Sequence, residues 1–390
     1  MIVRQFLHWI RTAPAGERAE ATGALARAYL YSDLSNEDRA AAEGAMIMLL
    51  DDASPLVRQA LAEALAGSAD APYAVIHALA SDHAGIAALV LARSPLLIDA
   101  ELVDLVATSG GDLQAAIAAR APLQCAVAAA IAEVGSAEAC LIAVENPHSE
   151  IAPSSFDRIV TRFGRLGAIR EALFARPDLP LAARHVLMGQ LSSLLADFVV
   201  DREWLSRGRA DLVVREACEK GTVAIAALAP DADTRPLIRH LRDSGQLTAG
   251  LVLRALLSGN VAMFEDVLAE LSGLPLGRVQ ALVHDRGTSG FRAIYEKAGM
   301  PASTYVAFRE AVAAIRDGEE DGEYATSSRL KRRVIERVLT SCEGTDVDDI
   351  ESLLILLRRY AAEAARDDAR LYCEELVADD RRRDADRAAA

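Results

Sequence analysis

The sequence predicts an all-α protein, an α-solenoid of stacked short helix pairs that ends in a C-terminal helical hairpin. Three observations support this prediction. Hydrophobic residues make up 52% of the 390 residues but aromatic residues only 5%, a composition of small helix formers that suits closely packed helices. A turn followed by an apolar helix recurs along the first half of the chain. The length exceeds that of one ordinary core, so a core that grows along an axis is expected.

The charge balance argues against some classes of function. There are 57 acidic and 42 basic residues, and the formal net charge of −15 disfavours non-specific attraction to nucleic-acid backbones and to anionic membranes. Nearly all basic residues are arginine, which we attribute to coding bias rather than to selection for bidentate anion contacts. A local basic groove stays open as an alternative.

We expect a cytoplasmic protein with no membrane span and no disulfide framework. The five cysteines are odd in number and show no Cys-x-x-Cys spacing. The apolar face of residues 1–11 is interrupted by Arg4 and His8 and lacks a small-residue cleavage site, so a first packing helix is expected instead of a signal peptide. The longest uncharged stretches, such as residues 121–132, fall short of the ~20 apolar residues that span a bilayer.

An acidic or Asn turn that precedes an apolar helix marks the repeat. Asp52, Asp82 and Asp112 follow one another at intervals of 30 residues, and Asn146 comes after a somewhat longer interval. Each interval has room for two short helices. One helix pair cannot bury both of its faces, so successive pairs must stack on one another.

The unit that begins at Asp52 shows how each turn is expected to work. Its apolar residues follow helical spacing, at positions 56, 57, 60, 61, 64 and 65. Pro55 occupies the first helical turn, where a missing amide costs no hydrogen bond, and Ser54 or Asp52 can cap the exposed amides. Arg58 is expected to pair with a turn Asp of its own or an adjacent unit, which fixes the stacking register. A structural role is therefore assigned to Asp52, Pro55, Val57, Arg58, Asp82 and Asp112.

The pattern Asp52-x-x-Pro55-x-Val57-Arg58 resembles the turn-and-helix signature of HEAT repeats. Five further stretches are similar to a family of uncharacterised bacterial HEAT-like proteins, at residues 72–82, 90–99, 253–264, 282–285 and 294–301. The similar segments are spread along residues 35–315. The resemblance implies a HEAT-like solenoid and brings no established activity, so it leaves the function open.

Four segments are expected along the chain. They are N-terminal HEAT-like repeats (1–205), irregular helical repeats that continue the solenoid (206–316), an acidic linker (317–326), and a helical hairpin with a frayed tail (327–390). Residues 287–290 lack the spacing and the lysine of a phosphate loop and are expected to form a turn. Six glycines near the ends of apolar blocks are predicted helix C-caps: Gly208, Gly221, Gly245, Gly259, Gly273 and Gly287.

The C-terminal hairpin sets the expectation for oligomeric state. Ser327 and Ser328 are expected to cap the basic helix that follows the linker. The apolar stripe Leu353–Leu357 in the last helix must be hidden. Either it caps the last repeat of its own chain, which we favour, or it meets a second copy. The protein is thus expected to be a monomer or a homodimer through its C-terminal helices.

The sequence shows no constellation of residues that carries chemistry. It has no His-Glu-x-x-His helix, no Gly-x-Ser-x-Gly elbow and no glycine-rich phosphate cradle. His83 and His148 fall in repeat turns, His284 precedes Asp285, and no pair of histidines has metal-ligand spacing. We therefore assign no catalytic residue, no cofactor and no metal, and we do not expect an enzyme.

Two functions from different classes remain. The first, which we favour, is a non-enzymatic protein-interaction or regulatory scaffold with a protein partner that the sequence does not identify. The second is a nucleic-acid-binding protein, by analogy with HEAT-like DNA glycosylases that hold duplex DNA against a basic, aromatic-bearing face. The only two tryptophans, Trp9 and Trp204, are expected to pack inside the fold. Four arginines would favour the second function if they lined one concave face: Arg170, Arg184, Arg215 and Arg239.

Overall fold

The computed structural model describes residues 6, 8–227, 231–285, 288–320, 328–343 and 350–389. None of the helices in these ranges is both long and apolar enough to cross a lipid bilayer. The regular secondary structure of the same ranges is helical, and the backbone pairing of Leu123 with Ser149 is an isolated bridge. This part of the chain is therefore all-α, as the sequence predicts. The chain divides into two compact units, Met1–Ala183 (unit 1) and Arg184–Ala390 (unit 2).

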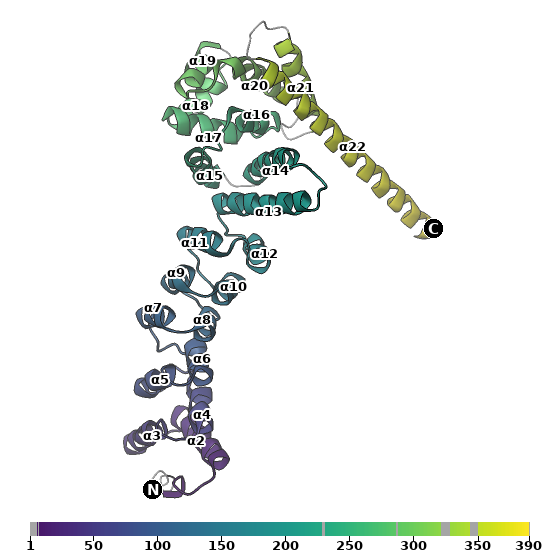
Figure 1. The fold of residues 1–390 in the computed structure, drawn as a ribbon. Helices are drawn as coiled ribbons and strands as arrows, with labels where there is room; N and C mark the ends of the chain where they lie inside the picture. Colours follow the sequence, from purple (N-terminus) through teal and green to yellow (C-terminus); the bar gives the residue numbers. More distant parts are fainter. Residues whose placement is uncertain are drawn as a thin grey trace. The chain divides into compact units, whose positions relative to one another are not determined.

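Unit 1 consists of two columns of short helices (Figure 1). In the first column each helix packs on the next: α2 (Ala15–Tyr31), α4 (Pro55–Leu65), α6 (Ala84–Arg93), α8 (Gly111–Ala118), α10 (Ala137–Glu145) and α12 (Gly167–Ala175). In the second column α3 packs on α5, and α7, α9 and α11 pack in succession: α3 (Asn36–Leu49), α5 (Tyr73–Ala80), α7 (Asp99–Thr108), α9 (Cys125–Val134) and α11 (Pro153–Phe163). Successive helix pairs therefore stack, and unit 1 is solenoid-like.

The buried positions of α4 explain the stacking. Val57, Leu61 and Leu65 are fully buried and recur every four residues, which places them on one face of the helix. Leu56 was expected on the same stripe but is 55% exposed. Ala62 is also fully buried, and residues without bulky side chains let neighbouring helix axes approach to the usual distance of about 8–10 Å. The helical spacing of the sequence therefore marks the stacking face.

Unit 2 begins with a hairpin of two long helices, α13 (Leu181–Asp201), whose first three residues precede the unit boundary, and α14 (Arg207–Ala227). The remaining helices are α15 (Asp231–Asp243), α16 (Ala249–Leu257), α17 (Val261–Ser272), α18 (Leu276–Val283), α19 (Thr288–Lys297), the 3-10 helix η1 (Ala302–Thr304), α20 (Tyr305–Glu320), α21 (Ser328–Glu343) and α22 (Ile350–Ala389).

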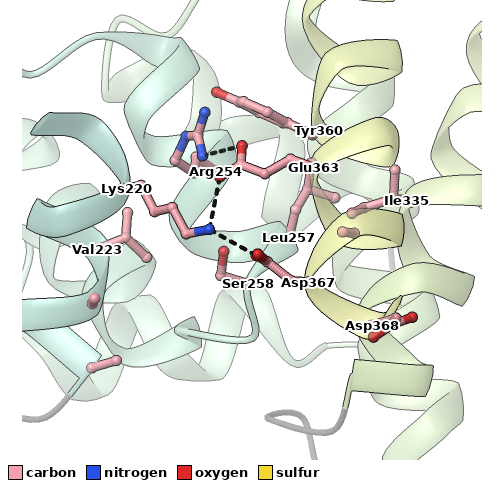
Figure 2. Close-up of a pocket in the computed structure, with 13 residues that line it drawn as sticks. Lys220, Val223, Arg254, Leu257, Ser258, Ile335, Tyr360, Glu363, Asp367 and Asp368 are labelled. Carbon is pink, nitrogen blue, oxygen red and sulfur yellow. Dashed lines mark hydrogen bonds and ion pairs between the residues drawn. The ribbon is translucent and has the colours of Figure 1, made fainter. Parts of the chain in front are cut away.

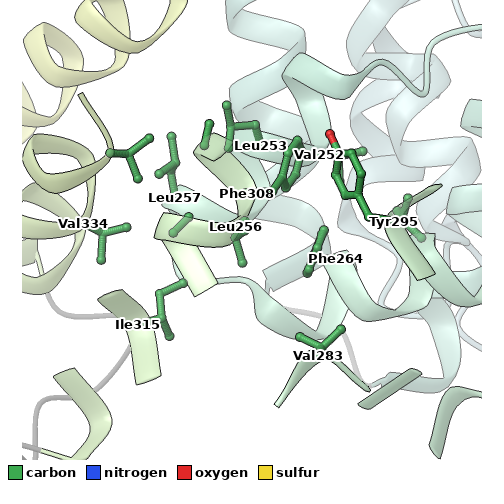
Figure 3. Close-up of a cluster of buried hydrophobic side chains, with 14 of the residues drawn as sticks. Val252, Leu253, Leu256, Leu257, Phe264, Val283, Tyr295, Phe308, Ile315 and Val334 are labelled. Carbon is green, nitrogen blue, oxygen red and sulfur yellow. The ribbon is translucent and has the colours of Figure 1, made fainter. Parts of the chain in front are cut away.

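The core of unit 2 surrounds α16 (Figure 3). Every residue of this helix from Leu251 to Leu257 is buried, and the helix packs against α14, α17, α20 and α21. A helix that is apolar on nearly all sides is expected at the centre of a bundle. Next to it, Phe264 stacks on Phe308 with 5.5 Å between ring centroids. We expected residues 206–316 to continue the stack of helix pairs. In this range α14 packs on α16, α15 on α17 and α17 on α19, while α16 is buried along its length and also packs against α17, α20 and α21.

Three boundaries differ from those predicted. The first unit ends at Ala183 rather than at residue 205. Just after this boundary, the side chain of His185 on α13 bonds to Thr222 of α14 and to Gln246, both in unit 2. Residues 317–320 of the predicted linker continue helix α20, and residues 321–326 lie outside the described residues. The tail expected to fray is helical up to Ala389. Ser327 lies outside the described residues, and Ser328 is the first residue of α21.

The predicted glycine caps fall into two groups. Three follow a helix and have positive φ angles, as helix C-caps do: Gly245 (69°), Gly259 (82°) and Gly273 (69°). Gly208 and Gly221 lie inside α14 instead. A side chain at Gly221 would collide with Met188 of α13, so this glycine lets the two helices approach each other. Gly287 lies outside the described residues.

Candidate functional site

The repeat-signature residues form a ladder of ion pairs in unit 1. Arg58 donates from Nε and Nη2 to the two carboxylate oxygens of Asp82, at 2.6 and 3.1 Å, and from Nη1 to the backbone oxygen of Asp52 at 2.5 Å. Asp82 belongs to the turn before the next helix of the column. Its carboxylate also accepts the backbone N–H of His83 at 2.6 Å. One arginine thus joins two successive turns.

A further ion pair of the ladder, between Arg18 and Asp52, was not predicted from the sequence. Arg18 makes the same bidentate contact with Asp52, at 2.9 and 2.7 Å. Both arginines are the fourth residue of their helices, α2 and α4. A proline lies about one helical turn before each arginine, Pro14 four residues before Arg18 and Pro55 three residues before Arg58, and this was a signal for the contact of Arg18. Hydrogen bonding to the guanidinium is the main cause that lowers the pKa of each aspartate, although partial burial acts in the opposite direction.

The other signature residues have separate roles. Pro55 is the first residue of α4 and Val57 is fully buried. The side chain of Ser54 does not cap α4; Asp52 accepts the N–H of Ser54 at 2.8 Å instead. Asp112 was expected to occupy the turn position of the third unit, but it lies in the first turn of α8 and is exposed.

The series of ion pairs stops after Asp82 because α6 has no arginine at its fourth position. That position holds Ala87, which is buried and has no side chain that could reach the following turn. The ladder position of α8 is filled by Gln114, whose Oε1 accepts the N–H of Ser136 at 2.9 Å and whose Nε2 donates to the oxygen of Val106 at 2.9 Å. An amide therefore replaces the ion pair in this unit.

Later units are joined by arginines that bind helix C-termini. Arg162 donates to the backbone oxygens of Ala132 and Gly135 at the end of α9, both at 2.7 Å. Arg176 donates to the oxygens of Asn146 and Ser149 after α10, at 3.0 and 3.1 Å. A cation at a helix C-terminus satisfies free carbonyls and complements the helix dipole. These contacts explain the repeat residues without a ligand.

The histidines do not gather into a metal site. No group of three or more His, Cys, Asp or Glu side chains with metal-binding geometry occurs in the described part of the chain. His284 lies 2.6 Å from the carboxylate of Glu265, which also accepts from Gln280 at 2.9 Å. His185 is buried, and its Nδ1 and Nε2 lie 2.9 and 2.8 Å from the side-chain oxygens of Thr222 and Gln246. His185 therefore fastens the base of the α13–α14 hairpin.

The four arginines considered for a basic face are divided between the units. Arg170 lies in unit 1 and donates to the backbone oxygen of Arg165 at 3.3 Å. The other three lie in unit 2. Of these, Arg239 is paired with Glu270 at 3.3 Å, and Arg242 contacts the same carboxylate. Pairing with acids lowers the positive potential that a phosphate backbone would meet.

A pocket of about 460 Å³ lies within unit 2, between α14, α16, α21 and α22 (Figure 2). Its walls include the apolar residues Val223, Leu257 and Ile335. Lys220 of α14 lies 2.7 Å from Asp367 and 3.2 Å from Glu363, both on α22. Lys220 thus binds two of the acids that line the pocket, from one helix to another.

Arg254 of the central helix is the most buried charge at this pocket. It is 5% exposed, its Nη1 donates to Glu363 at 2.8 Å, and its guanidinium carbon lies 4.2 Å from the ring centroid of Tyr360. Burial alone would lower the pKa of Arg254, but Tyr360 and Glu363 outweigh it and the pKa is raised. Glu219, 3.6 Å from Arg254, has a raised pKa because of burial. The network attaches α22 to α14 and α16.

The largest group of exposed apolar side chains in unit 2 lies at the far end of the α13–α14 hairpin. Seven residues there have exposed fractions between 37 and 64%: Leu194, Leu195, Phe198, Trp204, Leu205, Leu212 and Val213. We call these seven residues the apolar tip. Trp204 was expected to pack inside the fold but is 64% exposed, and Trp9 in unit 1 is 40% exposed.

The backbone of the turn holds Trp204 in place. The N–H of Glu203 donates to Val200 at 2.9 Å and the N–H of Trp204 donates to Val199 at 3.0 Å, the two bonds of a Schellman helix end. Glu203 occupies the left-handed position with φ of 58°, where glycine is usual. The ring of Trp204 meets Phe198 edge-on at 5.8 Å between centroids. Arg207 pairs with Asp197 at 2.7 Å across the hairpin.

Fold and surface together define an all-helical repeat protein with a helical hairpin that presents apolar side chains to solvent. The chain belongs to the family described as "Uncharacterised protein conserved in bacteria (DUF2336)", which it matches over residues 86–348. The matched range contains the apolar tip and Arg254, whereas the ladder of Asp52 and Arg58 precedes it. Searches of curated proteins and of solved structures returned no match for the chain.

Proposed function

We propose that this protein is a non-enzymatic protein-interaction scaffold of the cytoplasm, in which a HEAT-like repeat stack carries an adhesive hairpin. The observation that carries the proposal is the apolar tip. Monomeric proteins rarely expose contiguous apolar surface beyond a few hundred Å², and larger patches mark interaction sites. Aromatic anchors such as Trp204 and Phe198 are the residue types that dominate binding energy at protein interfaces.

The polar residues of the chain support the same proposal. The signature arginines and aspartates of unit 1 bind each other, and the charges at the pocket of unit 2 bind across α14, α16 and α22. Their contacts are explained by the stability of the fold. The apolar tip is different because nothing in the described part of unit 2 covers it, and its turn is held in a strained conformation.

A comparison of tip and control variants tests the proposal. We would capture proteins from native lysate with the full chain, with Phe198→Ser/Trp204→Ser, and with Tyr372→Ser as control. Tyr372 is 63% exposed on α22 and thus matches Trp204 in exposure. We expect a reproducible set of proteins that the tip variant loses and the control keeps. The same set with all three chains would contradict the proposal.

Nucleic-acid binding is the alternative, and salt separates the two functions. Phosphate contacts release counterions, so binding to DNA weakens steeply as salt increases. An apolar contact at the tip has no such dependence. A shift of duplex or single-stranded DNA at low salt that disappears steeply with added salt, and that is unchanged in the tip variant, would favour the alternative.

A further inference from the structure

We propose that the partner of the apolar tip is a second copy of this chain, so that two α13–α14 hairpins pair across a two-fold axis. This inference rests on the proposed function, since it names the partner of the same surface. In an isologous contact of this kind the same patch serves both copies, so the patch must be complementary to itself in area and in charge.

The apolar area matches what a stable dimer needs. Aromatic side chains have areas of roughly 150–250 Å², and the side chains of Leu and Val are smaller. The exposed fractions of 37–64% then leave on the order of 500 Å² of apolar surface at the tip. Two tips bury about twice this area. A standard interface buries about 1,200–2,000 Å² in total, a little over half of it apolar. The tip with its polar rim therefore reaches the lower part of that range.

The charges around the tip permit two copies to approach. Residues 194–213 contain three arginines and four acids, a net charge of 3 − 4 = −1. Per residue this segment is about as acidic as the whole chain, which carries −15 over 390 residues, and two acidic chains repel each other. Because the tip carries both signs of charge, arginines of one copy can meet acids of the other, which offsets this repulsion.

The distribution of these charges fits a two-fold arrangement. Arg207 is already paired with Asp197 of its own hairpin. Asp201 lies at the end of α13, and Arg209 lies on α14 beside the acid Asp211. Antiparallel pairing of two hairpins can place α13 of one copy beside α14 of the other, so that Asp201 faces Arg209 at both symmetry-related positions.

The hairpin is also prepared for binding before it meets a partner. His185 fastens its base, the Arg207–Asp197 pair lies near its turn, and the Schellman bonds set the position of Trp204. A surface that is already ordered loses less conformational entropy on association. The C-terminal stripe, the other route to a dimer, is used inside the chain: Leu353 and Leu357 are 5% and 0% exposed in the core of unit 2.

The experiment uses the full chain with Trp9→Phe, which leaves Trp204 as its single tryptophan. We would measure mass by sedimentation velocity and the tryptophan emission over a range of protein concentrations. We expect the mass to rise from one chain of 41.6 kDa to two, and the emission to move to shorter wavelength in parallel as Trp204 is buried. Leu195→Ser/Phe198→Ser in the same background should weaken self-association at least about 100-fold, as expected for two central anchors.

Tyr372→Ser is the matched control and should leave both readouts unchanged, and circular dichroism checks that every variant keeps its helical content. A monomer at all concentrations, or a dimer in which the emission of Trp204 does not move, would overturn the second copy as partner. If the chain is monomeric but the tip variant still loses proteins captured from lysate, the scaffold proposal stands and only this inference fails. If neither self-association nor the capture of proteins from lysate depends on the tip, both the scaffold proposal and this inference fail.

Discussion

The two units of this protein are held together in different ways. In unit 1, short helices stack in columns, and polar side chains such as Arg58 and Arg162 reach from one turn or helix end to the next. In unit 2, one buried helix, α16, is surrounded by other helices and by aromatic rings. Stability in unit 1 is therefore distributed among neighbouring repeats, whereas in unit 2 it is concentrated in one core.

This difference shows where function can lie. Stacked repeats whose polar groups bind their own neighbours leave little for a ligand, and the buried charges of unit 2 are likewise engaged with one another. The apolar tip belongs to neither kind of packing. In the described structure its apolar side chains are exposed to solvent, which is unfavourable for a single chain in water.

The largest expected effect concerns the core of unit 2. Phe264→Ala removes a fully buried ring that contacts Phe291 and Phe308, and it should lower the free energy of unfolding of unit 2 by about 3–5 kcal/mol. Amide hydrogen exchange should show lost protection across the whole unit. The matched change in unit 1 is Leu61→Ala, whose loss of protection should be confined to α4 and the helices beside it. If both substitutions removed protection over equally many helices, the proposed difference between the two units would be contradicted.

The next effect tests the buried charge at the pocket. Arg254→Ala leaves Glu363 and Glu219 without their buried cation and should destabilise unit 2 by about 3 kcal/mol, measured as a shift of the urea midpoint. Arg239→Ala is the control, because Arg239 is 59% exposed and its pair with Glu270 should contribute less than about 1 kcal/mol. Similar midpoints for the two variants would show that the network does not attach α22.

Opposite responses to pH should distinguish the units. The pKa values of Asp52 and Asp82 are lowered by their arginines, so the ion pairs stabilise unit 1 above the ordinary aspartate pKa, and this stability is lost as the pH falls through the lower folded values. The pKa of Glu219 is raised by burial, so its ionisation destabilises unit 2, and stability rises as the pH falls through the raised value.

Two variants check this sign. Asp82→Asn should lower the stability of unit 1 at neutral pH by about 1 kcal/mol and reduce its loss in acid. Glu219→Gln should raise the stability of unit 2 at neutral pH and flatten its dependence below pH 7. Exchange protection of each unit, followed from neutral to acidic pH, is the measurement. A destabilising Glu219→Gln would mean that its contacts with Arg254 and Arg359 outweigh the burial.

The sequence was sufficient to predict the helical fold and much of unit 1. The spacing of Val57, Leu61 and Leu65 marks a helix face, and Pro55 marks its start. Arg254 could not be assigned, because its partner Glu363 is 109 positions away and only the packing of α22 on α16 brings them together. Nor could the exposure of Trp204 be predicted, since apolar residues at helical spacing look the same whether a neighbour covers them or not. The spacing of the glycines wrongly predicted a helix C-cap at Gly221, which lies inside α14 at a close contact with Met188 of α13.

The smallest effect concerns the turn at the apolar tip. Glu203→Gly relieves the left-handed conformation at φ of 58° and should raise the stability of unit 2 by about 1 kcal/mol. Thermal unfolding measures the increase. Glu203→Ala should give no such gain, because alanine keeps the steric cost. An unchanged midpoint in the glycine variant would indicate that the turn is not strained.

The most direct test of the central claim, that the apolar tip is the interaction surface, is photo-crosslinking in the native cell. A photoreactive aromatic amino acid would replace Trp204 in one chain and Tyr372, of nearly equal exposure, in another. We predict an adduct from position 204, at the mass of two chains if the partner is a second copy, and no comparable adduct from position 372. Absence of any adduct at 204, or equal adducts at both positions, would contradict the account.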